Sequence, residues 1–147
     1  MKVSTKGRYG LRILLDVALN QDRGPVALSD ISRRQAISHK YLWQVINPLK
    51  SAGLLTATRG THGGYVLARP TEDISILDVV NILEGPVSIV NCVIAPKSCE
   101  RSTFCTTHEA WCEIQNKVKE AMSSITLKDL VKRHNEYESR SGQSYDI

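Results

Sequence analysis

The sequence predicts a mainly α-helical protein with a small β-hairpin wing: a winged helix-turn-helix domain followed by a long C-terminal dimerisation helix. Three observations predict this fold class. Residues 28–52 contain two short helical patterns separated by a tight connection. Residues 54–70 contain two short apolar runs around a glycine-rich turn. Apolar residues then recur at steps of three and four through residues 111–125.

Length and composition are those of one globular domain. The chain has 147 residues, 41% of them hydrophobic, without the apolar run of about 18 residues that a membrane span needs. The apolar stretch near the N-terminus is interrupted by Arg8, Arg12 and Asp16, and no small-residue cleavage site follows it. We therefore expect an amphipathic helix in a cytoplasmic protein rather than a signal peptide.

The charges divide the chain into two halves. Residues 1–69 carry 11 Lys and Arg against three Asp and Glu, whereas residues 70–147 carry eight against 12. A basic half joined to an acidic half suggests that the first half meets a polyanion. An ordinary solvated surface is the alternative. We do not expect an enzyme, because no Ser/His/Asp set, phosphate loop or paired carboxylates can be recognised.

The first helix is expected over residues 5–20. Its many apolar side chains leave little polar face, which predicts burial on more than one side. Gly24 and Pro25 then break the helical pattern. Ser29 is expected to cap a second, short helix that runs to about Gln35.

The third helix is expected to begin at Ser38, its N-cap, and to end near Ala52, where Gly53 can adopt the left-handed conformation that closes helices. Pro48 removes one backbone donor and should kink this helix or end it early. The helical spacing assigns four side chains to its buried face: Leu42, Val45, Ile46 and Leu49.

A β-hairpin is expected directly after this helix. Val66 and Leu67 supply the apolar content of its second strand, and Pro70 ends it. The small residues at the tip let the backbone approach another molecule, and Arg59 suits a phosphate or a narrow minor groove. A further helix is expected over residues 71–84, with an inner stripe of Ile76, Leu77, Val80 and Leu83.

The exposed face of the third helix predicts DNA binding. It carries Lys40, Trp43, Gln44 and Asn47, with Ser38, His39 and Tyr41 at its N-terminal end. Amide side chains can bond adenine edges, lysine can reach guanine, and hydroxyl groups can hold phosphates. No acidic residue lies between Asp30 and Glu72, whereas an ordinary solvated face would be rich in Lys and Glu. A winged helix that binds another protein is the alternative.

All four cysteines of the chain fall within residues 92–112, and His108 lies among them. Structural disulfides are not expected in a reducing cytoplasm, and chance core cysteines do not explain four in 21 residues. Three cysteines and one histidine are a common zinc set, but zinc ligands usually come in pairs two to four residues apart. The gaps here are six, five and six residues, which favours an iron–sulfur cluster.

The fourth ligand stays open on spacing alone. Cys105, His108 and Cys112 lie at positions i, i+3 and i+7 and share one helix face if the helix already includes Cys105. Either His108 or Cys112 can therefore complete the set. The other interpretation of Cys112 is a buried core thiol beside Trp111.

The C-terminal part predicts a partner helix. Trp111, Ile114, Val118, Met122 and Ile125 form a narrow seam that suits a second copy of the chain, although it could also pack on the chain's own core. Thr126 is expected to cap a last short helix over residues 127–134. We thus divide the chain into the DNA-binding domain (1–84), the cysteine-rich cluster-binding loop (85–108), the dimerisation helix with the short helix (109–134) and a flexible tail (135–147).

Four segments together resemble one family: "STKGRYGLRILLDVAL", "DISRRQAISHKYLWQVINPLKSAGL", "RGTHGGYVLARP" and "SITLKDL". They are similar to the IscR/NsrR-type family of bacterial winged-helix transcriptional regulators, closest to its iron–sulfur cluster regulator IscR. The resemblance covers about residues 1–133. It implies a homodimeric repressor or activator whose binding to an operator in double-stranded DNA changes with the state of a cluster. By the same resemblance, the residues that contact DNA are Ser38, Lys40, Tyr41, Trp43, Gln44 and Arg59.

The resemblance also implies the ligands. Cys92, Cys99 and Cys105 match the three cysteine ligands, and "CTTHEAW" makes His108 the fourth ligand of a [2Fe–2S] cluster. The nitric-oxide sensors of the family use an N-terminal acid, but this chain has Arg8 in that region, which favours the IscR-like branch.

Two features depart from the IscR pattern. The first gap is one residue longer, and Cys112 is an additional thiol, so ligation by cysteines alone, a [4Fe–4S] cluster or zinc stay open. A cluster-free regulator that responds to nitric oxide, redox state or cysteine metabolism is the alternative function, although CymR-like members lack this cysteine set. His39 and His62 are expected at the surface near DNA, and no role is expected for His134.

Overall fold

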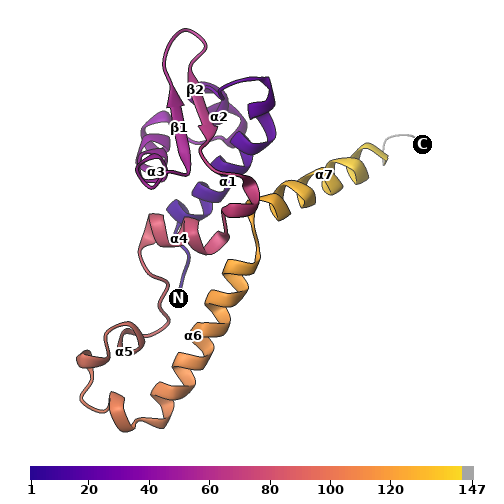
Figure 1. The fold of residues 1–147 in the computed structure, drawn as a ribbon. Coiled ribbons are helices and arrows are strands. Elements are labelled where there is room, and N and C mark those ends of the chain that lie inside the picture. The colour runs from indigo at the N-terminus through magenta and orange to yellow at the C-terminus, as the bar shows by residue number, and fades with distance from the viewer. Residues whose placement is uncertain (144–147) are drawn as a thin grey trace.

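The structure, a computed structural model, describes residues 1–143 and confirms the winged-helix fold class. Figure 1 shows a body of helices with a hairpin, from which the long C-terminal helices leave in different directions. The elements are α1 (Thr5–Asn20), α2 (Leu28–Gln35), α3 (His39–Ser51), β1 (Leu55–Thr58), β2 (Gly64–Leu67), α4 (Ile76–Glu84), α5 (Asn91–Ile94), α6 (Thr106–Ser124) and α7 (Leu127–Gln143). Among these helices none combines the length and the apolar character that crossing a bilayer would require.

Helix α1 runs through the centre of the body, with the bounds that the sequence predicts. Its N-cap Ser4 accepts hydrogen bonds from the backbone N–H groups of Lys6 and Gly7, which satisfies two of the donors that a helix start leaves free. The helix packs against α2, α3, α4 and α7. Gly10 permits the close approach of α4, because a side chain there would collide with Leu83.

The helix-turn-helix is α2 and α3. Helix α2 begins at Leu28, one residue before Ser29, and its N-cap Ala27 makes no side-chain hydrogen bond, so the predicted Ser29 cap is wrong. Ala36 ends α2 in the left-handed region with a φ of 53°. Ser38 caps α3 as predicted, since its hydroxyl accepts a hydrogen bond from the N–H of Tyr41 at 3.3 Å.

Helix α3 buries the four side chains that the spacing predicts, and Gly53 closes it with a φ of 75°. The helix continues past Pro48 to Ser51, close to the predicted end near Ala52, so of the two effects expected of Pro48 an early end does not occur. A proline at this position frees the carbonyl four residues earlier. That carbonyl belongs to Gln44, an exposed residue, and water can therefore satisfy it.

The wing is an antiparallel pair in which Leu55 lies opposite Leu67 and Thr58 opposite Gly64. Val26 adds a bridge to it, with two backbone hydrogen bonds of 2.9 Å to Tyr65. Tyr65 is buried, whereas the expected apolar contributors Val66 and Leu67 are half-buried. The prediction did not single out Tyr65, although aromatic side chains are enriched in strands.

The fourth helix is shorter than predicted. Residues 71–73 form one turn of 3-10 helix, and α4 begins only at Ile76. Ser75 and Asp78 form a reciprocal capping box, in which each side chain bonds the backbone N–H of the other, and this sets the start of the helix. Val80 and Leu83 are buried as predicted, and Val79 is buried as well. Ile76 and Leu77, which were also predicted to face inward, are only half-buried.

The junction between α6 and α7 is tied to the start of α4. The N–H of Ile76 donates to the carbonyl of Ile125 at 3.0 Å, and the N–H of Leu127 donates to that of Ile74 at 2.8 Å. Thr126 caps α7 as predicted, because its hydroxyl accepts a hydrogen bond from the N–H of Asp129.

Helix α7 is longer than the predicted short helix. It continues to Gln143, so residues 135–143 are helical and not a tail; the rest of the expected tail, residues 144–147, lies outside the described residues. Its start is anchored by Leu127, which is buried in the core, and by Leu130, which packs against that core. Opposite charges four residues apart, at Lys132, Glu136 and Arg140, suit the more exposed remainder of the helix.

Candidate DNA-reading surface and cysteine site

The outer face of α3 is open to solvent. Ser38, His39, Lys40, Gln44 and Asn47 are exposed, and Trp43 keeps 45% of its surface accessible. The exposed indole ring of Trp43, which is apolar but carries a donor N–H, suits an interface with a small apolar centre and polar surroundings. The structure therefore places five of the six predicted DNA-contacting side chains on α3 or at its start.

Tyr41 differs from its neighbours because it is half-buried. Its ring meets Tyr9 of α1 edge-on, with 5.6 Å between the ring centroids and an angle of 85° between the planes. The guanidinium of Arg12 lies 5.0 Å from the centre of the Tyr9 ring. Helix α1 thereby supports the N-terminal end of α3.

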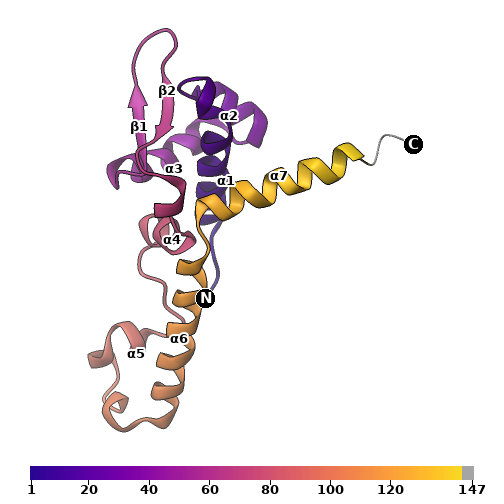
Figure 2. The ribbon, with the colours of Figure 1, turned by 45° about the vertical axis from the view of Figure 1, so that its right-hand side comes forward.

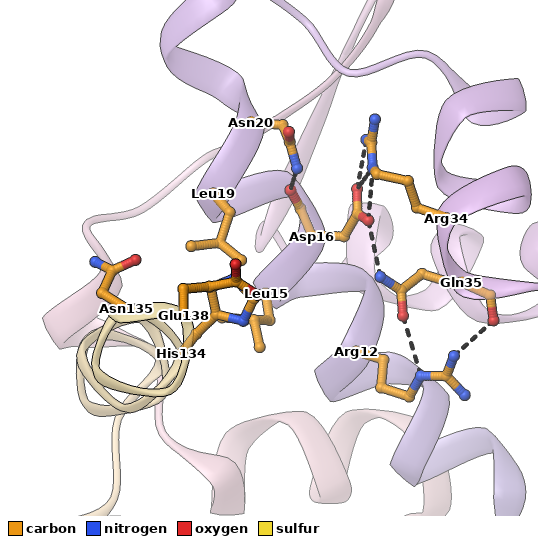
Figure 3. A pocket seen from close by; sticks show the side chains of 10 residues that line it. All are labelled: Arg12, Leu15, Asp16, Leu19, Asn20, Arg34, Gln35, His134, Asn135 and Glu138. Carbon is orange, nitrogen blue, oxygen red and sulfur yellow. Dashed lines mark hydrogen bonds and ion pairs between the residues drawn. The ribbon is translucent and has the colours of Figure 1, made fainter. Parts of the chain in front are cut away.

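A polar network joins α1 to the end of α2, directly before the turn. Asp16 is 3% exposed, and its carboxylate accepts hydrogen bonds from Arg34 at 2.7 to 3.2 Å and from the side chain of Gln35 at 2.8 Å. Arg12 donates to the backbone and side-chain oxygens of Gln35 at 2.6 and 3.0 Å. Figure 3 shows these groups along one wall of an open groove of about 600 Å³, with His134 of α7 opposite.

The Asp16 network was missed from the sequence. The hydrogen bond to the Asp16 carboxylate raises the pKa of Arg34 above its usual value. The available signal was an acid in the middle of an apolar helix, which has to find a partner when buried. Nothing local in the sequence indicates that the partner lies 18 residues later.

The hairpin tip extends the reading surface. Figure 1 shows the loop between β1 and β2 projecting beyond the helices. Arg59, Thr61 and His62 are exposed there, and Gly60 has a φ of 112°, a conformation that favours glycine. Arg59 therefore stands on a separate element from α3, as a wing contact requires.

The cysteine segment, residues 92–112, lies at the N-terminal end of α6. Figures 1 and 2 show α5 and the loop after it beside the first turns of α6, remote from the hairpin. The loop contains two single turns of 3-10 helix, residues 96–98 and 102–104. No residue from 91 to 110 is buried, although this segment holds Cys92, Cys99 and Cys105.

Part of the expected ligand set converges on the start of α6. His108 Nε2 lies 3.0 Å from the carbonyl oxygen of Cys92, and the Sγ of Cys112 lies 3.7 Å from the same nitrogen. Cys112 is half-buried and Trp111 is 39% exposed, which contradicts a buried core thiol beside the tryptophan. Cys99 is exposed on the loop.

Cys105 lies just outside the helix. It is the residue before α6, so His108 and Cys112 share a helix face without it. The hydrogen bond with the Thr107 hydroxyl, at 3.0 Å, is the main cause that lowers the pKa of the Cys105 thiol. Within residues 1–143 no three His, Cys, Asp or Glu side chains are arranged as a metal-binding group.

Gln115 attaches the segment after α4 to α6. Its side chain is 1% exposed, accepts a hydrogen bond from the N–H of Ile89 at 2.9 Å and donates to the carbonyl of Val87 at 2.7 Å. A glutamine inside a helix usually faces water, so the sequence contained no signal for this role.

A helix-turn-helix with a polar exposed face, a wing and a long projecting helix defines a winged-helix transcriptional regulator that binds DNA. The chain belongs to the Rrf2 family, described as iron-dependent transcriptional regulators, which matches residues 3–133. The expectation that the chain is not an enzyme is confirmed, because the family consists of transcription regulators.

The chain is similar to several members of the family to about the same degree. The Rrf2 protein of Nitratidesulfovibrio vulgaris is 42% identical over 132 residues, which cover 90% of this chain and 88% of that protein. The structure of CymR, the global cysteine regulator of B. subtilis, is 38% identical with a TM-score of 0.77 and covers 90% of this chain and 98% of its own. The structure of T. potens IscR is 37% identical with a TM-score of 0.75, and the match covers 93% of this chain and 90% of the IscR chain.

Proposed function

We propose that this protein is a cytoplasmic, homodimeric regulator of the IscR type, which senses iron–sulfur cluster status through a [2Fe–2S] cluster and controls genes of cluster biogenesis. Overall similarity does not select this function, since CymR and IscR resemble the chain equally well. The cysteine segment carries the proposal.

The observation that carries it is the absence of a core in residues 91–110. A segment of this length without one buried side chain cannot be held in place by apolar contacts. Segments of this kind are commonly ordered by a metal, a disulfide or a partner chain. The thiol groups of this segment are themselves at least partly accessible, so they are free to serve as ligands.

The donor chemistry fits the proposed group. Three thiols and one imidazole are ligands that iron–sulfur clusters accept, and we assign them to Cys92, Cys99, Cys105 and His108. When bound, the cluster supplies an iron-dependent link between the loop and α6. His108 already lies against the backbone of Cys92, so closing the loop requires the approach of Cys99 and Cys105.

The structure suggests how loop order reaches the DNA-binding domain. Gln115 joins residues 87–89 to α6, and the α6–α7 junction is hydrogen-bonded to the start of α4. Helix α4 in turn packs against α1 and α3. An ordered loop therefore biases the position of α6 relative to the reading helix. It changes DNA affinity only by the difference in cluster affinity between free and DNA-bound protein.

We assign the DNA contacts by chemistry. Trp43 meets a base methyl group, Gln44 bonds an adenine edge and Lys40 reaches a guanine. Ser38 and Tyr41 bond phosphates at the start of α3, and Arg59 reaches a phosphate or the minor groove from the wing.

Exposed apolar side chains support the homodimer. Among the described residues, four of the seven large exposed hydrophobic side chains fall in the cysteine segment or the first half of α6: Ile94, Phe104, Trp111 and Ile114. Such a concentration marks an interaction surface. Val118, Met122 and Ile125, farther along the same seam, are half-buried within the single chain.

An anaerobic preparation tests the proposal. Absorption spectra and iron and sulfide assays should show two irons and two sulfides per chain, and a chelator should change affinity for operator DNA. Stoichiometric zinc without visible absorption would instead support a zinc-stabilised regulator. Identical DNA affinity for loaded and stripped protein would leave a cluster-independent DNA-binding protein, as the resemblance to CymR allows.

A further inference from the structure

His108 and Cys112 lie one turn apart on α6, on one face of the helix. The Sγ of Cys112 is 3.7 Å from Nε2 and 3.9 Å from Nδ1 of His108. The backbone carbonyl of Cys92 meets Nε2 at 3.0 Å, so the first cysteine of the loop approaches the same place. An imidazole nitrogen and a thiol sulfur, both able to bind a metal, therefore lie next to each other on the side of α6 that the loop approaches.

The cysteine segment offers one donor more than a [2Fe–2S] cluster needs. Four thiols and one imidazole are available for four protein ligands. Cys92, Cys99 and Cys105 are spread along the loop, at separate points of the chain. His108 and Cys112, which lie one helical turn apart, are therefore the two alternatives for the fourth ligand.

We propose that Cys112 is an alternative fourth ligand that exchanges with His108, so that the protein holds its cluster in two ligand forms. This inference rests on the cluster proposed above. In the exchange, the bond from iron to the imidazole nitrogen breaks and a bond from iron to Cys112 sulfur forms. The thiol proton passes to the imidazole, and no electron is transferred.

The two forms differ in charge and reduction potential. A thiolate in place of a neutral imidazole adds one negative charge to the cluster. Histidine in place of cysteine is known to raise the potential of [2Fe–2S] clusters, so the Cys112 form is the harder of the two to reduce. The chain thus combines a histidine-ligated form with an all-cysteine form in one site.

Four variants of the full-length protein, prepared without air, test the exchange: His108→Ala, Cys112→Ser, the double variant and Cys92→Ser. Iron and sulfide content measures loading, and pulsed EPR of the reduced cluster detects coupling to a histidine nitrogen. Both single variants should keep at least half of the wild-type cluster. The nitrogen coupling should vanish in His108→Ala and persist in Cys112→Ser. The double variant should lose the cluster at least ten-fold, as Cys92→Ser does.

Three results overturn the inference. His108→Ala as empty as Cys92→Ser shows that Cys112 does not ligate, and a loaded double variant shows that neither residue is needed. His108→Gln, which keeps a polar side chain of similar size, must agree with His108→Ala, and circular dichroism checks α6 in each variant. Wild-type protein that takes up no cluster refutes the proposed function itself, and with it this inference.

Discussion

Asp16 lies in the middle of the apolar helix α1, and its carboxylate receives hydrogen bonds from two residues of α2. A second Asp–Arg pair, Asp30 with Arg33, lies on the outer side of α2 with side chains 49% and 73% exposed. Burial distinguishes the two pairs, since the Asp16 side chain is 2% exposed. The buried Asp16–Arg34 pair should therefore contribute more to the free energy of unfolding than the exposed Asp30–Arg33 pair.

We expect Asp16→Ala to lower the free energy of unfolding by about 2 kcal/mol, because it leaves Arg34 and Gln35 without their acceptor. Asp30→Ala is the matched control and should cost less than about 1 kcal/mol, because water replaces an exposed partner. Guanidinium unfolding followed by circular dichroism at one protein concentration measures both. Equal losses would mean that the Asp16 network does not hold α2.

Trp43 and Arg59 should affect DNA binding in different ways. Trp43→Ala should weaken operator binding by about 1–3 kcal/mol and leave non-specific binding nearly unchanged, because base contacts carry sequence information. Arg59→Ala should weaken both and reduce the salt slope by about 1, because it removes a phosphate contact. Fluorescence anisotropy across a salt series separates these effects. A uniform loss in Trp43→Ala would contradict base contact.

At the scale of elements, side-chain hydrogen bonds hold a segment against a helix and set where a helix begins. Gln115 attaches the segment after α4 to α6, and a reciprocal pair formed by Thr126 and Asp129 begins α7. The first contact holds two segments together, and the second sets the first turn of α7.

Gln115→Ala should detach the segment after α4 from α6. The N–H of Ile89 and the carbonyl of Val87 lose their partner, so we expect amide exchange at Ile89 to accelerate about ten-fold, which corresponds to about 1.4 kcal/mol. Hydrogen exchange measured by NMR tests this, with Asn116→Ala, an exposed amide on the same helix, as control. Unchanged exchange in Gln115→Ala would show that other contacts hold the segment.

The start of α7 should depend on pH. Hydrogen bonds from the backbone N–H and then the hydroxyl of Thr126 lower the pKa of Asp129. A lowered carboxyl pKa in the folded state stabilises the protein above the unfolded pKa of about 4, and this contribution disappears as pH falls through the lower folded value. The stability difference between wild type and Asp129→Asn should be constant above about pH 5 and shrink below about pH 4. A difference independent of pH would exclude this ionised cap.

At the scale of the whole molecule, the cysteine segment and the first half of α6 lie far from α3 and the hairpin (Figure 2). They expose several large apolar side chains. DNA-binding domains of this kind commonly bind two half-sites as dimers, and the exposed seam is placed to join two copies. The proposed cluster site and the proposed dimer surface then meet at α6, which carries both His108 and the exposed seam.

Ile114→Glu should dissociate the proposed dimer. The side chain is 44% exposed in the single chain, and burying a carboxylate at the interface of both copies should weaken dimerisation at least about a hundred-fold. Asn116→Glu, on the opposite side of α6, should leave it intact. Sedimentation velocity at several concentrations measures the state. Dimers of unchanged affinity in Ile114→Glu would place the interface elsewhere.

The sequence by itself determined the elements that local signals specify. The bounds of α1, the Ser38 cap, the buried face of α3 and the hairpin all follow from caps, periodicity and glycine or proline at element ends. These signals act over a few residues, so they can be recognised without knowing the fold. The exposed face of α3 follows for the same reason, because spacing defines a helix face, whereas the individual DNA contacts come from the resemblance to the family.

Only the tertiary structure decided which distant groups meet. It paired Asp16 with Arg34, buried Tyr65 and Gln115, and placed the backbone carbonyl of Cys92 against His108. These contacts depend on how helices cross and where loops return, and residue spacing carries no information on either. The sequence showed which candidate ligands are present and that His108 and Cys112 share a helix face, and the fold decided that the backbone of Cys92 meets His108 there.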